Sequence, residues 1–150
     1  MKILKSLLPL LLLMFCITGY AQKDKDKHEQ IKALKVSYFT TELNLSTDEA
    51  AKFWPVYNAY DEKQFKLRHD IMRGLIKKID EVGLDKMSDK EAEGYLTKLE
   101  AADKELFSLK SKLVDDLKPI IGSAKILKLK KAEEDFKKKL LEQYKDKKKD

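Results

Sequence analysis

Apolar residues recur every three or four positions along most of the chain, a spacing that places them on one face of an α-helix. No segment shows the strict alternation of apolar and polar residues that is typical of a strand. The pattern is interrupted in three places by Asn, Gly, Pro and Ser. We therefore predict an all-α protein with four helices, over residues 30–43, 47–82, 89–118 and 124–144.

The predicted helix boundaries carry recognisable capping signals. Ser46 is followed three residues later by Glu49, and Ser88 is followed in the same way by Glu91. Each pair is a capping box, in which the two side chains bond to each other's backbone N–H groups at a helix N-terminus. Gly83 favours a helix stop, because glycine readily takes the left-handed conformation just beyond a C-terminus.

The prolines at positions 55 and 119 predict irregularities in the helices. Pro55 lies inside the second helix, where the missing N–H group predicts a kink. Pro119 favours the end of the third helix at Lys118, because a residue before proline avoids the helical conformation. Ser123 is then a suitable N-cap for the fourth helix.

The second and third helices are each long, and only residues 83–87 join them. Such a short link predicts an antiparallel hairpin. The third helix carries a heptad pattern typical of a packing seam, with apolar side chains at Ala92, Leu96, Leu99, Ala102, Leu106, Leu109, Leu113, Leu117 and Ile120. The second helix carries a matching stripe at Tyr57, Tyr60, Leu67, Ile71, Leu75 and Ile79. Gly74 and Gly94 indicate either a close crossing of the two backbones or glycines tolerated at the surface.

The N-terminus has the pattern of a secretory signal peptide. Lys2 and Lys5 precede a short apolar run over residues 7–17, and small residues lead to Ala21. We predict cleavage after Ala21, which gives a signal peptide over 1–21, a disordered charged tail over 22–29, a helical domain over 30–144 and a basic tail over 145–150. The apolar run is too short for a membrane-spanning helix, and cleavage removes the only cysteine.

Charge is abundant and unevenly distributed. Asp, Glu, Lys and Arg make up 39% of the chain, and the formal net charge is +6. Residues 125–150 hold eleven Lys against six acidic residues, whereas residues 22–124 are close to neutral. This basic segment is either a solvated helix end or a patch that attracts unfolded chains, acidic lipid or an acidic protein domain. The candidate partner-binding residues are Lys130, Lys131, Lys137, Lys138 and Lys139.

The chain lacks the residue patterns of an active site. Its two histidines, His28 and His69, have no further His or Cys near them in the predicted mature sequence, and a metal site needs three or four converging ligands. Asp70 follows His69 directly, but adjacent side chains on an α-helix point about 100° apart. We predict no catalytic residue, no cofactor and no metal. Export also argues against nucleic acid as a partner.

The second helix begins with a motif that resembles the LTxxQ motif of the Spy/CpxP family, small all-helical periplasmic proteins of Gram-negative bacteria. Residues 45–60, and residues 131–136 later in the chain, are similar to a Bacteroidetes-type branch labelled sensors of extracytoplasmic-function sigma factors. The motif residues are Leu45, Ser46, Glu49, Phe53, Trp54, Pro55 and Tyr57. Ser46 stands in place of the motif's Thr, and Glu49 in place of its Gln. The chain lacks the histidines of the metal-sensing relatives.

The resemblance implies a long bent helical hairpin with flanking helices, which dimerises into a cradle. It implies an ATP-independent, holdase-like chaperone of the envelope stress response, which binds unfolded periplasmic proteins. The alternative is a regulatory partner of a membrane-bound sensor kinase or of a sigma factor and its anti-sigma system. The aromatic cluster around Trp54 then serves either as core packing or as an exposed anchor.

Overall fold

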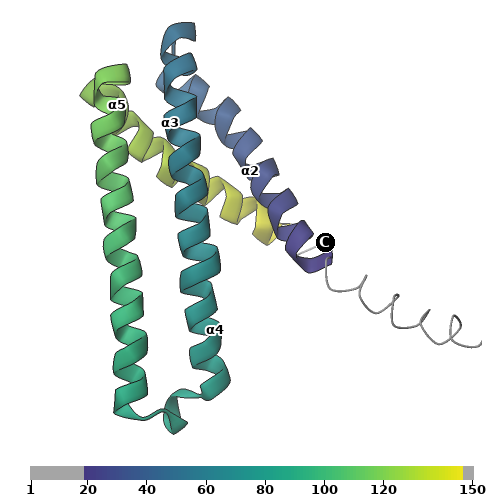
Figure 1. Ribbon diagram of the computed structural model, residues 1–150. Helices are drawn as coiled ribbons and strands as arrows, with labels where there is room; N and C mark the ends of the chain where they lie inside the picture. The colour runs from purple at the N-terminus through teal and green to yellow at the C-terminus, as the bar shows by residue number, and fades with distance from the viewer. Residues whose placement is uncertain (1–18, 147–150) are drawn as a thin grey trace, which may run out of the picture. The chain divides into compact units, whose positions relative to one another are not determined.

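The computed structural model describes residues 19–146, which form helices and turns and contain no strand. The predicted all-α class is therefore confirmed. The elements are α2 (Gly19–Leu43), α3 (Thr47–Lys66), the π-helix η1 (Leu67–Met72), α4 (Arg73–Val82), the 3₁₀-helix η2 (Leu84–Lys86) and α5 (Asp89–Asp146) (Figure 1). None of the helices over the described residues combines the length and the apolar character needed to cross a membrane. Residues 1–18 of the predicted signal peptide and 147–150 of the predicted tail lie outside this range.

The described residues form three helical stretches, not the predicted four: α2, the run from α3 to α4, and α5, which has a kink at Gly122. Pro119 does not end a helix, because α5 continues through it to Gly122. Gly122 alone leaves the helical conformation, with φ 74° and ψ 163°, and Ser123 is already helical again. Pro119 and the residue four positions earlier, Asp115, are both exposed, so water can satisfy the carbonyl group that the proline leaves unpaired.

The second helix likewise passes through its proline. Pro55 lies inside α3, where a kink is predicted, and the backbone remains α-helical there. Pro55 is exposed, and so is Ala51, whose carbonyl would have accepted the missing bond. The irregular stretch of this helix lies further along, at η1.

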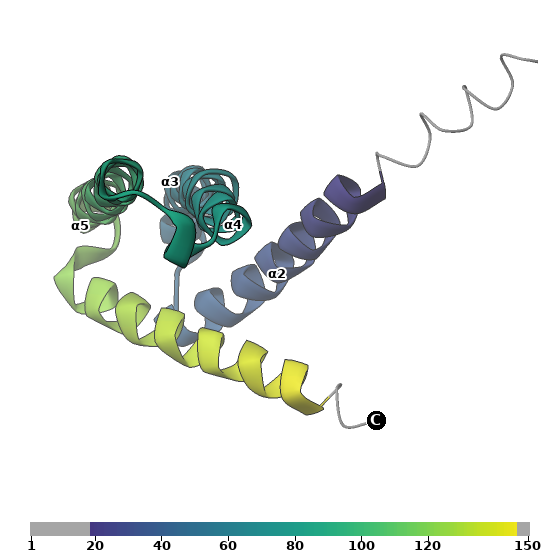
Figure 2. The same ribbon diagram turned by 90° about the horizontal axis from the view of Figure 1, so that it is seen from below.

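The chain divides into two compact units. Among the described residues, the terminal unit comprises residues 19–42 and 132–146, and the hairpin unit comprises Leu43–Lys131. In the hairpin unit, the run from α3 to α4 and the first part of α5 lie side by side as two legs, joined by the turn at η2 (Figures 1 and 2). The predicted antiparallel hairpin is thus present.

Residues 22–29, for which we predict a disordered tail, belong to α2 in the structure. Neither glycine nor proline occurs between Tyr20 and Trp54, and Lys, Gln and Glu all favour the helical conformation. Lys32 Nζ also lies 3.8 Å from Glu29 Oε1, one turn away. Charge alternation without an apolar face is therefore compatible with helix here.

The hairpin is held together by apolar side chains along the facing sides of its legs. Leu67, Ala102 and Leu106 form a buried cluster, and Met72 and Leu109 pack against it. The other buried apolar residues of the legs are Phe53, Tyr57, Tyr60, Leu113, Leu117 and Ile121. The middle of the predicted heptad seam is confirmed by these positions.

The π-helix changes which residues of the first leg face this seam. Arg73 N–H donates to the carbonyl of Arg68, five residues earlier, where an α-helix would use the fourth. The additional residue in this turn rotates everything after it. Met72, five positions after Leu67, therefore joins the core cluster, whereas Ile71 is 47% exposed. The predicted stripe is wrong at Ile71 for this reason.

The terminal unit has a small aromatic core. Phe39 is fully buried, and Phe136 of α5 is 8% exposed. Their rings meet edge to face with centroids 5.8 Å apart, and the Tyr38 ring lies 5.6 Å from that of Phe136. The first predicted helix is thus tied to the last one through aromatic contacts.

Of the two interpretations of Gly74 and Gly94, the structure excludes the close backbone crossing. A Cβ atom added at either position meets no atom within 4 Å. Gly83 differs, because its φ of 82° lies in the region that favours glycine. The predicted helix stop at Gly83 is therefore confirmed.

Removing Asp70 tests the register change in η1. We expect this deletion to turn the π-helix into regular α-helix and to leave Met72 facing Ala102, because Met72 then follows Leu67 by four positions. The free energy of unfolding in urea should change by less than about 1 kcal/mol, as is usual for exposed sites. Removing the exposed Lys104 from α5 is the control. That deletion rotates Leu106 out of the seam and should cost more than about 3 kcal/mol. Equal losses for both deletions would contradict the register change.

The substitutions Gly74→Ala and Gly94→Ala should each raise the free energy of unfolding by up to about 1 kcal/mol, because alanine favours the helix and nothing obstructs its Cβ. The same change at Gly83 should destabilise by about 1 kcal/mol or more, because alanine is strained at a positive φ. Thermal and urea unfolding of the single variants gives the comparison. Destabilisation at Gly74 or Gly94 would show that the backbones approach each other there after all.

Candidate partner-binding surfaces

The motif at the start of α3 builds a complete capping box. Ser46 N–H donates to Glu49 Oε2 at 2.9 Å, and Glu49 N–H donates to Ser46 Oγ at 3.2 Å. The second box repeats this geometry at the start of α5, where the Ser88 N–H donates to Glu91 Oε2 at 3.0 Å. Both predicted caps are confirmed, and both are structural features of the hairpin.

Glu49 has a second role that a capping box does not require. Lys125, three residues beyond Gly122 on α5, donates from Nζ to Glu49 Oε2 and to the carbonyl of Asn44 at 3.0 Å. The Lys125 and Glu49 side chains are about a quarter exposed, at 26% and 25%. We call the set of Asn44, Glu49 and Lys125 the capping junction, because it joins the N-terminus of α3 to the helix beyond Gly122.

The capping junction also affects the acidity of Glu49. The hydrogen bond from Lys125, and after it the backbone N–H of Ser46, hold the pKa of the Glu49 carboxyl below its ordinary value. In the second box, the Ser88 hydroxyl and then its backbone N–H lower the pKa of Glu91. Both carboxylates therefore remain charged into the acidic range.

The aromatic part of the motif lies in the core. Phe53 is fully buried and Tyr57 is 2% exposed, with their rings stacked at 5.4 Å. Trp54 is half-buried, and its ring meets that of Phe53 edge to face at 4.9 Å. Burial of Phe53 and Tyr57 supports the core-packing interpretation of this cluster over that of an exposed anchor.

All five candidate lysines lie on α5 and are exposed: Lys130, Lys131, Lys137, Lys138 and Lys139. Lys139 nevertheless has an intramolecular role, since its Nζ lies 4.4 Å above the centre of the Tyr38 ring. This cation–π contact ties α5 to α2 within the terminal unit. Lys137 and Lys138 lie next to two large exposed side chains, Leu141 and Tyr144.

The hairpin exposes large apolar side chains, one of which is predicted in the seam. Leu96 is predicted in the seam but is 59% exposed, whereas Tyr95, seven residues before Ala102, is half-buried. Phe107, in the middle of α5, is 74% exposed. Its neighbours three and four positions away, Asp103, Lys104, Lys110 and Ser111, are exposed as well.

The far end of the hairpin also exposes apolar side chains. α4 has apolar residues at helical spacing, yet none of its residues is buried. Ile76 of α4 is 48% exposed and Leu84 of the turn is 73% exposed. The hairpin topology puts both at the same end of the unit as Leu96. The spacing of apolar residues predicts an apolar face on this helix. It does not show that no segment within residues 19–146 covers that face.

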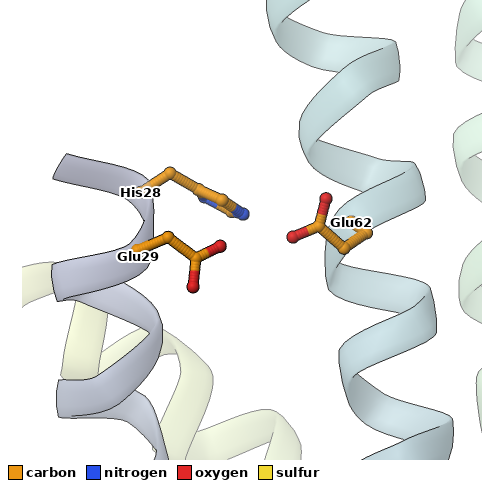
Figure 3. Close-up of side chains that lie close together, drawn as sticks. All are labelled: His28, Glu29 and Glu62. Atoms are coloured by element: carbon orange, nitrogen blue, oxygen red, sulfur yellow. The ribbon is translucent and has the colours of Figure 1, made fainter. Parts of the chain in front are cut away.

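The two histidines belong neither to the capping junction nor to the exposed lysines and apolar side chains described above. His69 stacks on Phe65 at 5.1 Å, and its Nδ1 lies 3.1 Å from Asp70 Oδ1, a contact that the expected 100° separation did not predict. Both residues belong to η1, in which successive side chains are turned less far apart. His28 and Glu29 belong to α2 and Glu62 to α3 (Figure 3). Those two helices fall into different units, and we assign no metal site to these three residues.

Comparison of the chain with family models, with curated proteins and with solved structures gives no match. The resemblance to the Spy/CpxP family therefore rests on the motif residues alone.

The capping junction should make stability depend on pH in the acidic range. Because the pKa of Glu49 is lower in the folded protein, its contribution is complete above the ordinary glutamate pKa of about 4.3 and is lost as the pH falls through the folded value. We expect Glu49→Gln and Lys125→Met each to lower the Tm at neutral pH and to flatten the acid side of the Tm profile.

Glu91→Gln is the matched control, since it removes a capping carboxylate whose pKa is lowered by the Ser88 hydroxyl and backbone N–H. It should flatten the profile less than Glu49→Gln does. Identical profiles for the two variants would show that Lys125 does not contribute to stability.

Proposed function

We propose that this protein is exported to the periplasm of a Gram-negative cell and acts there without ATP, as a holdase-like binder of unfolded envelope proteins. The exposed apolar side chains of the hairpin support this proposal most directly. We call Ile76, Leu84, Leu96 and Phe107 the hairpin apolar set. These four large apolar side chains are 48–74% exposed and lie on three elements of one unit, where a client chain can reach them.

The spacing of this set suits weak and reversible binding. Leu96 and Phe107 are 11 residues apart, which is about 16 Å along a helix, and charged residues lie between them. A short apolar stretch of an unfolded chain can cover one such side chain at a time. Each contact then buries little area, at roughly 25 cal/mol per Å² of apolar surface, and several must act together.

The charge of the protein fits the same role. The hairpin carries acidic and basic residues in similar numbers. These charges keep a bound segment of the client chain hydrated. At the other end of the sequence, α5 ends in exposed lysines. Long-range attraction by lysines raises the rate at which acidic or partly unfolded chains arrive. In this proposal no residue catalyses a reaction and no cofactor takes part.

The test is suppression of light scattering by an aggregating client protein. We expect the wild-type protein to suppress scattering at severalfold molar excess and the double variant Leu96→Ser/Phe107→Ser to lose most of this effect. Both side chains are exposed, so far-UV circular dichroism and Tm should stay unchanged. Leu127→Ser is the control, because Leu127 is 68% exposed but lies beyond the hairpin legs.

Four outcomes separate the alternatives. Absence of suppression by the wild type, or an equal loss in the Leu127 control, contradicts the holdase proposal. A tight stoichiometric complex with one inner-membrane protein in a pull-down supports the regulatory role. A fall in molar mass of the Leu96→Ser/Phe107→Ser variant in solution shows that a second copy of the chain covers this surface.

A further inference from the structure

The last turns of α5 have two different faces. Ala132 and Phe136 are 3% and 8% exposed and belong to the core of the terminal unit. Leu141 and Tyr144, one turn apart on the outer face, are 53% and 48% exposed. An amphipathic helix that already buries one face has no need of further large apolar groups on the other.

Lysines surround these two exposed side chains. Lys137 and Lys138 precede Leu141 by four and three positions, and Lys145 follows it by four, so all three lie on the same side of the helix. All three are exposed. Two exposed acidic residues lie among them: Glu134, seven positions before Leu141, and Glu142, four positions after Lys138 and three before Lys145. We call Lys137, Lys138, Leu141, Tyr144 and Lys145 the outer face of α5.

We propose that the outer face of α5 binds the surface of an anionic lipid bilayer. In this arrangement the helix lies parallel to the membrane plane, with Leu141 and Tyr144 at the level of the headgroups. The lysine side chains extend along the apolar boundary and place their ammonium groups at lipid phosphates. The site lies in the terminal unit and does not depend on the hairpin apolar set.

The basic residues of this segment are all lysines, as are all but two of the basic residues in the whole chain. Residues 125–150 hold eleven Lys and no Arg. Protein–protein interfaces are enriched in Arg and depleted in Lys, because the planar guanidinium forms directed pairs with carboxylates. Lysines interact instead as mobile point charges with a continuous negative surface. Lys147, Lys148 and Lys149 add to the positive charge of the same end of the sequence.

Two apolar side chains give only a small hydrophobic contribution, so electrostatics must dominate the affinity. Binding should therefore be reversible and should weaken as salt screens the lysines. A lysine near an anionic membrane surface contributes roughly a factor of five in affinity. Lys139 is not counted, because its ammonium group already lies over Tyr38.

Vesicle co-sedimentation tests the proposal with the full chain. Vesicles of phosphatidylcholine and phosphatidylglycerol are compared with vesicles of phosphatidylcholine alone. Mass spectrometry of the intact proteins establishes that all variants have the same N-terminus. We expect binding to the anionic vesicles that falls with salt. Lys137→Glu/Lys138→Glu should weaken it by more than about tenfold, whereas Lys137→Arg/Lys138→Arg should retain it.

Lys104→Glu/Lys110→Glu is the matched control, since it makes the same change of charge at exposed positions of the hairpin. It should retain most of the binding. The substitutions Leu141→Ser/Tyr144→Ser should weaken binding without changing its salt dependence. Equal binding to both vesicle types, or equal losses for the two charge reversals, would overturn the proposal whatever the outcome of the scattering experiment.

Discussion

One carboxylate joins the N-terminal cap of α3 to the part of the hairpin unit that lies beyond Gly122. Glu49 completes the N-terminal cap of α3 and at the same time accepts the ammonium group of Lys125. Gly122, three residues before Lys125, has a backbone conformation that few other residues adopt and has no side chain to pack. The direction in which the chain continues from Gly122 to Lys131 is therefore set by contacts beyond the glycine, and the capping junction is the first of them. A local helix signal thus also determines a contact between segments far apart in sequence.

A second constraint is the register of the hairpin legs. The cluster of Leu67, Ala102 and Leu106 fixes one level of the interface, and η1 adjusts the first leg so that Met72 also meets α5. A regular helix would have placed Ile71 nearer the seam and turned Met72 away. The π turn costs some hydrogen-bond geometry locally but retains packing over the next turns. The exposure of Ile71 is a direct consequence of this adjustment.

Short-range chemistry explains which features the sequence predicts well. Both capping boxes and the stop at Gly83 involve residues within four positions of each other, so their patterns determine their geometry. The middle of the seam is predicted equally well because Leu106 and Leu113 repeat in register. Features that depend on a residue far away in the sequence cannot be predicted from one sequence. Three such features depend on another helix: the register change at η1, the exposure of Leu96 and the cation–π contact of Lys139 with Tyr38. The helices continue through Pro55 and Pro119, because both prolines are exposed and water can replace the lost hydrogen bond.

The distribution of exposed apolar groups argues for transient partners over one tight regulatory complex. A specific and stable complex buries about 1,200–2,000 Å² in a contiguous, well-packed patch. On the hairpin, Leu96 and Phe107 are separated by three turns that include Glu100, Asp103 and Lys104, all exposed. Closing a dry interface over those charges would require a partner charge for each, because an unpaired buried charge costs far more than one apolar side chain returns. A mobile chain avoids this cost by covering one apolar group and leaving the charges in water.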